Sequence, residues 1–232
     1  MEEGISEKST TMLGNLFDKN SEFFIHDRLH PHWSQDGAIV FITFRTKDSI
    51  PADVIKRWNI EKNEWIDRKS RSLQCDLRHG QMWHDVLNQL PRDLRGEFVE
   101  TFSGHRDTKL DECLGQCVLR DPHNAQIVAD SLLHFDNDRY SMGDFVVMPN
   151  HIHLLVAFPD ADSLEKQQAS WLRFTATQIN RRINQSGHFW QQEPFDHLVR
   201  SLEQYEYLQN YIRDNPAKAK LKPGEYLYYR RS

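Results

Sequence analysis

Two histidines one residue apart, His151 and His153, stand inside the apolar stretch FVVMPNHIHLLVAF at residues 145–158. Successive side chains of a β-strand point to opposite faces, so in a strand these two imidazoles share one face. Two neutral imidazoles on one face can bind a single divalent cation. A second pair, His30 and His32, flanks a proline that disfavours a regular strand, and we interpret that pair as incidental in a chain with 12 histidines. Ordinary buried histidines are the alternative that the spacing of His151 and His153 leaves open.

A second group of reactive side chains lies in SLEQYEYLQNYIRDNP, residues 201–216. Tyr207 and Tyr211 are four residues apart and share one face of a helix, and Asn215 follows four residues later. A phenol hydroxyl can act as a nucleophile, and an amide oxygen can complete a cation site. Pro216 predicts that the helix ends near Asn215, which leaves the direction of that amide open. Packing of the tyrosines as an amphipathic surface is the alternative that periodicity favours.

The composition, with 38% hydrophobic and 27% charged residues in a chain of 232, is typical of a soluble globular protein. No apolar run approaches the roughly 18–20 residues of a membrane-spanning helix, and the acidic N-terminus does not resemble a signal peptide. The three cysteines, Cys75, Cys113 and Cys117, favour a reducing compartment over a disulfide scaffold. No second ligand pair follows Cys113 and Cys117 at zinc-site spacing, so we interpret them as core or loop cysteines.

The charge is distributed unevenly along the chain. The net charge of −5 disfavours a nucleic-acid-binding protein when it is taken over the whole sequence. Residues 1–164 hold 18 Lys/Arg against 27 Asp/Glu, a net of −9, whereas residues 165–232 hold 11 against 7, a net of +4. Such asymmetry can mark one surface that meets polyanions and another that does not.

The predicted elements alternate between strands and helices. β-branched and aromatic runs predict strands, and apolar spacing of three and four residues predicts helices. In chain order we expect a strand at 37–46, a helix at 52–70, two short helices within 81–102, a loop-rich connection at 103–121, a helix at 122–135, strands at 140–148 and 151–158, a helix from about 162 to 184, a partly extended stretch at 188–200 and a final helix from 201. This order predicts an α+β sandwich, an antiparallel sheet with helices on one face.

Three segments in this order, VVMPNHIHLLV, FWQQEPFDHLVR and YIRDNPAKAKL, resemble the REP-associated tyrosine transposases, which belong to the single-tyrosine HUH (His, hydrophobe, His) transposases. The resemblance is clearest over residues 138–222, and the strand at 37–46 looks like the first strand of that family. Residues 52–121 are longer than the corresponding connection in compact members.

The resemblance implies a ferredoxin-like fold in which His151 and His153 hold a divalent cation, Mg²⁺ or Mn²⁺. Asn215 stands where relatives place a third polar group near the metal. Tyr211 matches the family's nucleophile, and Tyr207 is the alternative. The implied reaction is cleavage and rejoining of single-stranded or hairpin DNA through a 5′-phosphotyrosine intermediate.

The resemblance also guides which side chains we expect to meet DNA. Stacking aromatic groups and cations bind single strands, which favours Trp190, Arg200, Arg213 and Lys218. His197, within a family-like D-H-x-x-R run that begins at Asp196, is either a further ligand or a DNA contact. We expect a cytoplasmic, nucleoid-associated monomer or homodimer with no membrane contact.

The expected organisation is a lead-in at 1–36, one HUH transposase-like domain at 37–222 with a helical insertion at 52–121, and a C-terminal tail at 223–232. Two other functions stay open. A replication initiator or relaxase would share the metal site, although such proteins usually carry a further large domain. A domesticated DNA-binding protein would recognise hairpins without cutting them.

Overall fold

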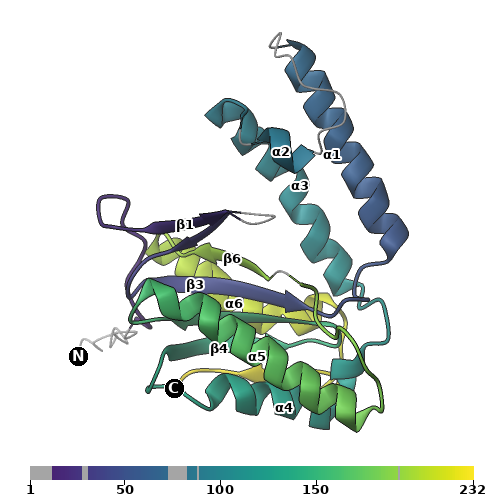
Figure 1. The fold of residues 1–232 in the computed structure, drawn as a ribbon. Helices are drawn as coiled ribbons and strands as arrows, with labels where there is room; N and C mark the ends of the chain where they lie inside the picture. The colour runs from purple at the N-terminus through teal and green to yellow at the C-terminus, as the bar shows by residue number, and fades with distance from the viewer. Residues whose placement is uncertain (1–11, 28–30, 73–82, 88, 193) are drawn as a thin grey trace, which may run out of the picture.

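The computed structural model describes residues 12–27, 31–72, 83–87, 89–192 and 194–232, so Cys75 and His30 lie outside the described part (Figure 1). Its centre is a five-stranded antiparallel sheet in the order β6-β3-β5-β4-β7. The strands are β3 (Ile39–Arg45), β4 (Ser141–Val147), β5 (His151–Ala157), β6 (Phe195–Leu198) and β7 (Leu227–Tyr229). The expected α+β class is confirmed.

The first four of these strands and two helices follow the split βαβ pattern of ferredoxin-like folds. The chain order is β3, α4 (Pro122–Leu133), β4, β5, α5 (Ala161–Arg182), β6. The turn at Pro149 and Asn150 joins β4 to β5 as adjacent antiparallel strands, as the sequence predicts. Asp160 caps α5 by accepting a hydrogen bond from the backbone of Ser163, and the helix begins at Ala161, close to the expected start at about residue 162.

Helices cover both faces of the sheet, not one face as expected. One face packs its apolar side chains, including Val40, Ile42 and Leu154, against α4 and α5. The opposite face, including Phe41 and Leu155, packs against α6 (Leu202–Lys218). In Figure 1, α5 and α6 lie on opposite sides of the sheet. The ferredoxin-like core therefore carries an additional helix on the face towards which His151 and His153 point.

Helix α6 begins where the sequence predicts and continues further than expected. Ser201 is its N-cap and accepts a hydrogen bond from the backbone of Gln204. We expected Pro216 to end the helix, but it lies inside the helix, which runs on to Lys218. The tertiary packing of Asn215 and Pro216, both buried, outweighs the hydrogen bond that the proline cannot donate.

Between β3 and α4, three helices of the described residues form an arm that projects from one end of the sheet (Figure 1). It consists of α1 (Ala52–Ser72), α2 (Trp83–Leu87) and α3 (Arg92–Asp111). The arm has an apolar cluster of its own, in which Phe98 packs against Trp65 and Trp83. Helix α3 continues through much of the stretch that we expected to be a loop, and a short 3-10 helix, η1 (Val118–Arg120), follows it.

The two ends of the chain contribute more structure than a lead-in and a tail. Within residues 12–36, β1 (Phe24–Asp27) and β2 (Pro31–Ser34) form an antiparallel pair. Within residues 223–232, β7 pairs with β4 and completes the sheet. Among the helices of the described residues, none combines the length and the apolar character needed to cross a membrane.

Candidate metal and tyrosine site

The two histidines of the HIH motif lie side by side on the α6 face of the sheet. They occupy the first and third positions of β5, and the rings are 4.7 Å apart between centroids. Across the sheet, His151 pairs with Arg45 and His153 pairs with Thr43 of β3. Both side chains are buried, with exposed fractions of 0% and 1%. The shared face that strand alternation predicts is therefore present.

The orientation of His151 is set by the residue before it. The amide of Asn150 donates from Nδ2 to the carbonyl oxygen of Leu114 at 2.9 Å, and its Oδ1 lies 2.7 Å from Nδ1 of His151. An amide oxygen only accepts hydrogen bonds, so Nδ1 of His151 carries the proton. The Nε2 atom is then left with a lone pair, which is the form in which a histidine binds a metal ion.

His153 is held by the neighbouring strand and faces a tyrosine. Its Nδ1 lies 2.9 Å from Oγ1 of Thr43, and its ring stacks on Phe41. On the other side, its Nε2 lies 3.4 Å from Oη of Tyr211. When Nδ1 donates to Thr43, Nε2 is available as a second imidazole ligand directed at the same phenol.

Asn215 brings an unpaired oxygen to the same place. Neither its Oδ1 nor Nε2 of His151 has a hydrogen-bond partner, and both atoms are fully buried. Burial lowers the pKa of His151 to about 3, and a hydrogen bond between the charged ring and Asn215 opposes that lowering. At neutral pH both atoms are acceptors, so they cannot bond to each other. A cation or a proton placed between them would satisfy both.

Three tyrosines of α6 differ in their surroundings. Tyr205 is buried in the apolar cluster under the sheet, whereas Tyr207 is 63% exposed. Tyr211 is half-buried and lies between them in accessibility. Its ring contacts His153, with 5.1 Å between centroids, and stacks on Tyr207 at 6.3 Å. Of the three hydroxyl groups, Tyr211 Oη is the one found beside a histidine nitrogen.

These residues fit a divalent cation. Two imidazole nitrogens and one amide oxygen form a mixed donor set, and two of its three atoms are buried without partners. In the described ranges, no group of three or more His, Cys, Asp or Glu side chains could hold a metal ion. An amide ligand does not belong to those four residue types, which is how this set differs from a carboxylate or cysteine site.

Of the four side chains expected to bind DNA, one is buried and three are exposed. Trp190 is buried on the other face of the sheet and donates from Nε1 to Thr175 Oγ1 at 2.9 Å. A buried indole has no free face on which a base could stack, so the structure corrects this expectation. Arg200, Arg213 and Lys218 are exposed, and all three lie on α6 or directly before it.

Lys218 is the cation of this set that contacts the candidate nucleophile. Its Nζ lies 4.7 Å from the ring centroid of Tyr211. Arg213 instead pairs with its neighbour Asp214, at 2.8 Å between Nε and Oδ1.

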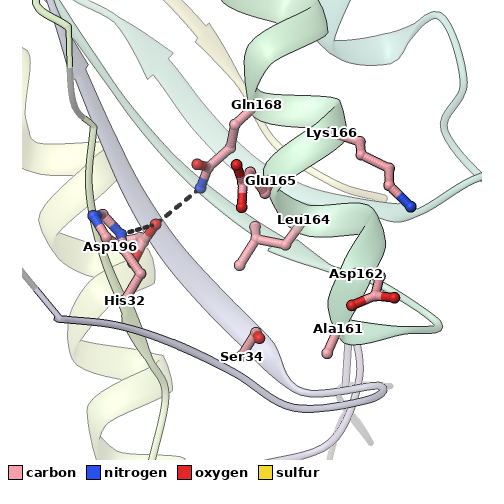
Figure 2. A pocket seen from close by; sticks show the side chains of 9 residues that line it. All are labelled: His32, Ser34, Ala161, Asp162, Leu164, Glu165, Lys166, Gln168 and Asp196. Atoms are coloured by element: carbon pink, nitrogen blue, oxygen red, sulfur yellow. Dashed lines mark hydrogen bonds and ion pairs between the residues drawn. The ribbon is translucent and has the colours of Figure 1, made fainter. Parts of the chain in front are cut away.

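Asp196 and His197 of the D-H-x-x-R run point to opposite faces of β6. Asp196 accepts from Gln168 at 3.0 Å, and both its oxygens lie 2.9 Å from Nδ1 of His32. These three side chains, labelled in Figure 2, lie close together near the start of α5. They are among the residues that line a cavity of about 310 Å³. His197 contacts Phe41, whose ring also stacks on His153. The pair therefore does not form one site.

Three supporting residues were missed by sequence reasoning. Asn150 directly precedes the HIH motif, and that position was a usable signal. Thr43 and Asp111 are 110 and 104 residues from the side chains they contact, and no local pattern marks either of them.

Comparisons with known proteins give one match. No family model matches the sequence, and no curated protein matches it. A solved structure of a REP-associated tyrosine transposase bound to a REP hairpin is similar over 82% of this chain and 72% of that chain, with 16% identity and a TM-score of 0.42. Similarity at this level does not identify catalytic residues.

Proposed function

We propose that this protein is a metal-dependent endonuclease and strand transferase that cuts and rejoins single-stranded, hairpin-associated DNA through a 5′-phosphotyrosine intermediate. One observation carries the proposal. Tyr211 Oη lies 3.4 Å from Nε2 of His153, beside the unpaired acceptors of His151 and Asn215. A tyrosine next to a set of cation ligands is suited to metal-assisted covalent cleavage of a phosphodiester.

Each residue has a separate task in this proposal. His151, His153 and Asn215 would hold Mg²⁺ or Mn²⁺, and the bound cation would offset the charge of the phosphate oxygens and orient the scissile group. Asn150 and Thr43 keep the two imidazoles turned so that their Nε2 atoms face the site. Burial of both histidines excludes water from their ring faces and keeps the ligands in place.

The covalent step exchanges one phosphate ester for another. Tyr211 Oη forms a bond to phosphorus while the bond from phosphorus to the 3′ oxygen breaks. The proton that the phenol loses balances the proton that the departing 3′ oxygen gains. Because the tyrosyl ester conserves the energy of the broken bond, attack by another 3′-OH can rejoin strands without ATP.

The substrate follows from charge and from access to the phenol. Tyr211 lies on α6, within the C-terminal part of the chain that has a net charge of +4, and Lys218 contacts its ring. An unpaired strand can bend so that one phosphate reaches a half-buried hydroxyl, and cations along its path hold the backbone. The hairpin preference rests on the sequence motifs shared with REP-associated transposases.

The test is formation of a covalent adduct. Labelled single-stranded, hairpin and duplex DNA from around the gene is incubated with wild type, Tyr211→Phe or Tyr207→Phe, with Mn²⁺, Mg²⁺ or EDTA, and run on a denaturing gel. Tyr207 is a matched control because it is the same residue type one helical turn away and exposed.

We expect a metal-dependent adduct on single strands that Tyr207→Phe keeps and Tyr211→Phe loses. An adduct that survives Tyr211→Phe would move the nucleophile to Tyr207. Tight hairpin binding without an adduct under any condition would contradict the proposed enzymatic activity and would favour a protein that binds hairpins without cutting them.

A further inference from the structure

The base of the helical arm touches the candidate metal site at two amides. Nδ2 of Asn215 lies 3.4 Å from Oδ1 of Asp111, the last residue of α3. Nδ2 of Asn150 donates to the carbonyl oxygen of Leu114, three residues further on. One short segment at the end of the arm therefore contacts both amide side chains of the site.

The contact with Asp111 determines which way the Asn215 amide points. A carboxylate only accepts hydrogen bonds, so the amide presents NH₂ to Asp111 and turns its oxygen away. The reversed amide would place Oδ1 against a negatively charged oxygen. The orientation that results leaves Oδ1 as a buried atom without a partner, in the same state as Nε2 of His151.

Asp111 stands at a position that helix electrostatics disfavour. The C-terminal end of a helix carries partial negative charge, and cations are the stabilising residues there. The segment is nevertheless held firmly, since Leu110 is fully buried against Ile50 and Val54 at the start of the arm. The contact with the Asn215 amide gives this acidic residue a local role at the helix C-terminus.

We propose that Asp111 is a positioning residue for the metal site. It holds the carbonyl oxygen of Asn215 towards His151 and thereby raises the affinity of the site for a divalent cation. The helical arm is then part of the metal site through its last residue. This inference rests on the metal site of the proposed function, and it concerns cation binding in the absence of DNA.

The experiment measures Mn²⁺ binding to the DNA-free full chain by isothermal titration calorimetry. Supporting ligands of this kind typically change metal affinity by 10- to 100-fold, and we expect a loss of that size for Asp111→Ala. Asp111→Asn removes the charge but keeps an oxygen that can accept from Asn215, so it should stay within about 3-fold of wild type. Glu112→Gln, which removes a negative charge from an exposed neighbour paired with Lys109, should leave the affinity unchanged.

The variants separate orientation from charge and from folding. Equal losses for Asp111→Ala and Asp111→Asn would overturn the inference, because the carboxylate would then act only through its charge. Unchanged binding by Asp111→Ala would overturn it while leaving the proposed function standing. No Mn²⁺ binding by wild type would overturn the metal site itself. Far-UV circular dichroism of each metal-free variant checks the fold. Where the Ala variant unfolds, Asp111→Leu takes its place: it fills the volume of the carboxylate but offers no acceptor to Asn215, so the same 10- to 100-fold loss is expected, and unchanged binding would overturn the inference.

Discussion

Nε2 of His151 and Oδ1 of Asn215 are two buried acceptors that face one site, and neither has a hydrogen-bond partner. The proton on Nδ1 of His151, required by Asn150, makes Nε2 an acceptor, and Asp111 does the same for Asn215 by binding its NH₂ group. Buried acceptors without partners cost folding free energy, on the order of 1–3 kcal/mol each. In the proposed function, a bound cation would satisfy both acceptors and offset this cost.

Replacing Asn215 with Leu should separate stability from metal binding. The substitution removes an unpaired buried oxygen but also the amide group that contacts Asp111, so we expect the free energy of unfolding of the metal-free variant to stay within about 1 kcal/mol of wild type. If the proposed metal site binds Mn²⁺ in the folded state only, Mn²⁺ should stabilise wild type by about 2.7 kcal/mol at a concentration 100 times the dissociation constant, and the variant should lose this increment. Urea unfolding with Mn²⁺ and with EDTA measures both. A metal-free variant that is destabilised by more than about 2 kcal/mol would mean that Asn215 is a structural residue.

Thr43 is expected to support the site through His153. Thr43→Val keeps the shape but removes the hydroxyl, which leaves Nδ1 of a buried imidazole without this partner. We expect a loss of about 1–3 kcal/mol in the free energy of unfolding and a 10- to 100-fold loss in Mn²⁺ affinity. Thr175→Val is the control, because Thr175 is buried on α5, on the opposite side of the sheet, where its hydroxyl donates to the carbonyl oxygen of Trp171 and accepts from Nε1 of Trp190. Equal Mn²⁺ affinities for the two variants would contradict a role of Thr43 in orienting the ligand.

Local patterns in the sequence predict the parts of the site that come from single elements. Strand alternation places His151 and His153 on one face, and helical spacing places Tyr211 and Asn215 on one face. The direction of Asn215 was unpredictable because tertiary packing carries α6 through Pro216. Trp190 was misplaced because the local sequence of an aromatic stretch does not reveal which face of the sheet it will cover.

The arm should unfold locally when its own core is damaged. Phe98 is buried against Trp65, Trp83 and Phe102, away from the sheet. Phe98→Ala should cost about 3–5 kcal/mol of local stability. Hydrogen exchange followed by mass spectrometry should show faster exchange across α1 and α3, with exchange in β3 and β5 unchanged. Faster exchange throughout the sheet would show that the arm and the sheet unfold as one unit.

The cysteine pair should be unreactive at neutral pH. Burial raises the pKa of Cys113 to about 11 and raises the pKa of Cys117 as well. A raised thiol pKa keeps the sulfur protonated, so alkylation should be slow at pH 8 and accelerate as the pH rises towards 11. Iodoacetamide labelling is measured by mass spectrometry in a Cys75→Ser variant, in which Cys113 and Cys117 are the two remaining thiols that can be alkylated. Rapid labelling at pH 8 would contradict the raised pKa values. Protection from labelling by added Zn²⁺ would indicate that the two cysteines bind zinc.

Lys218 should matter for the rate of cleavage more than for folding. Its Nζ lies 4.7 Å from the Tyr211 ring centroid, where a cation can hold the phosphate that the phenol attacks. Lys218→Ala should slow adduct formation by about 10-fold. It should also lower the number of counterions released on DNA binding by about one, which is measured as a shallower dependence of the binding constant on salt concentration. Lys222→Ala, at another exposed lysine of the same basic segment, should change the salt dependence without slowing the covalent step. Equal rates of adduct formation for the two variants would mean that Lys218 only contacts the DNA backbone and has no specific role in the attack by Tyr211.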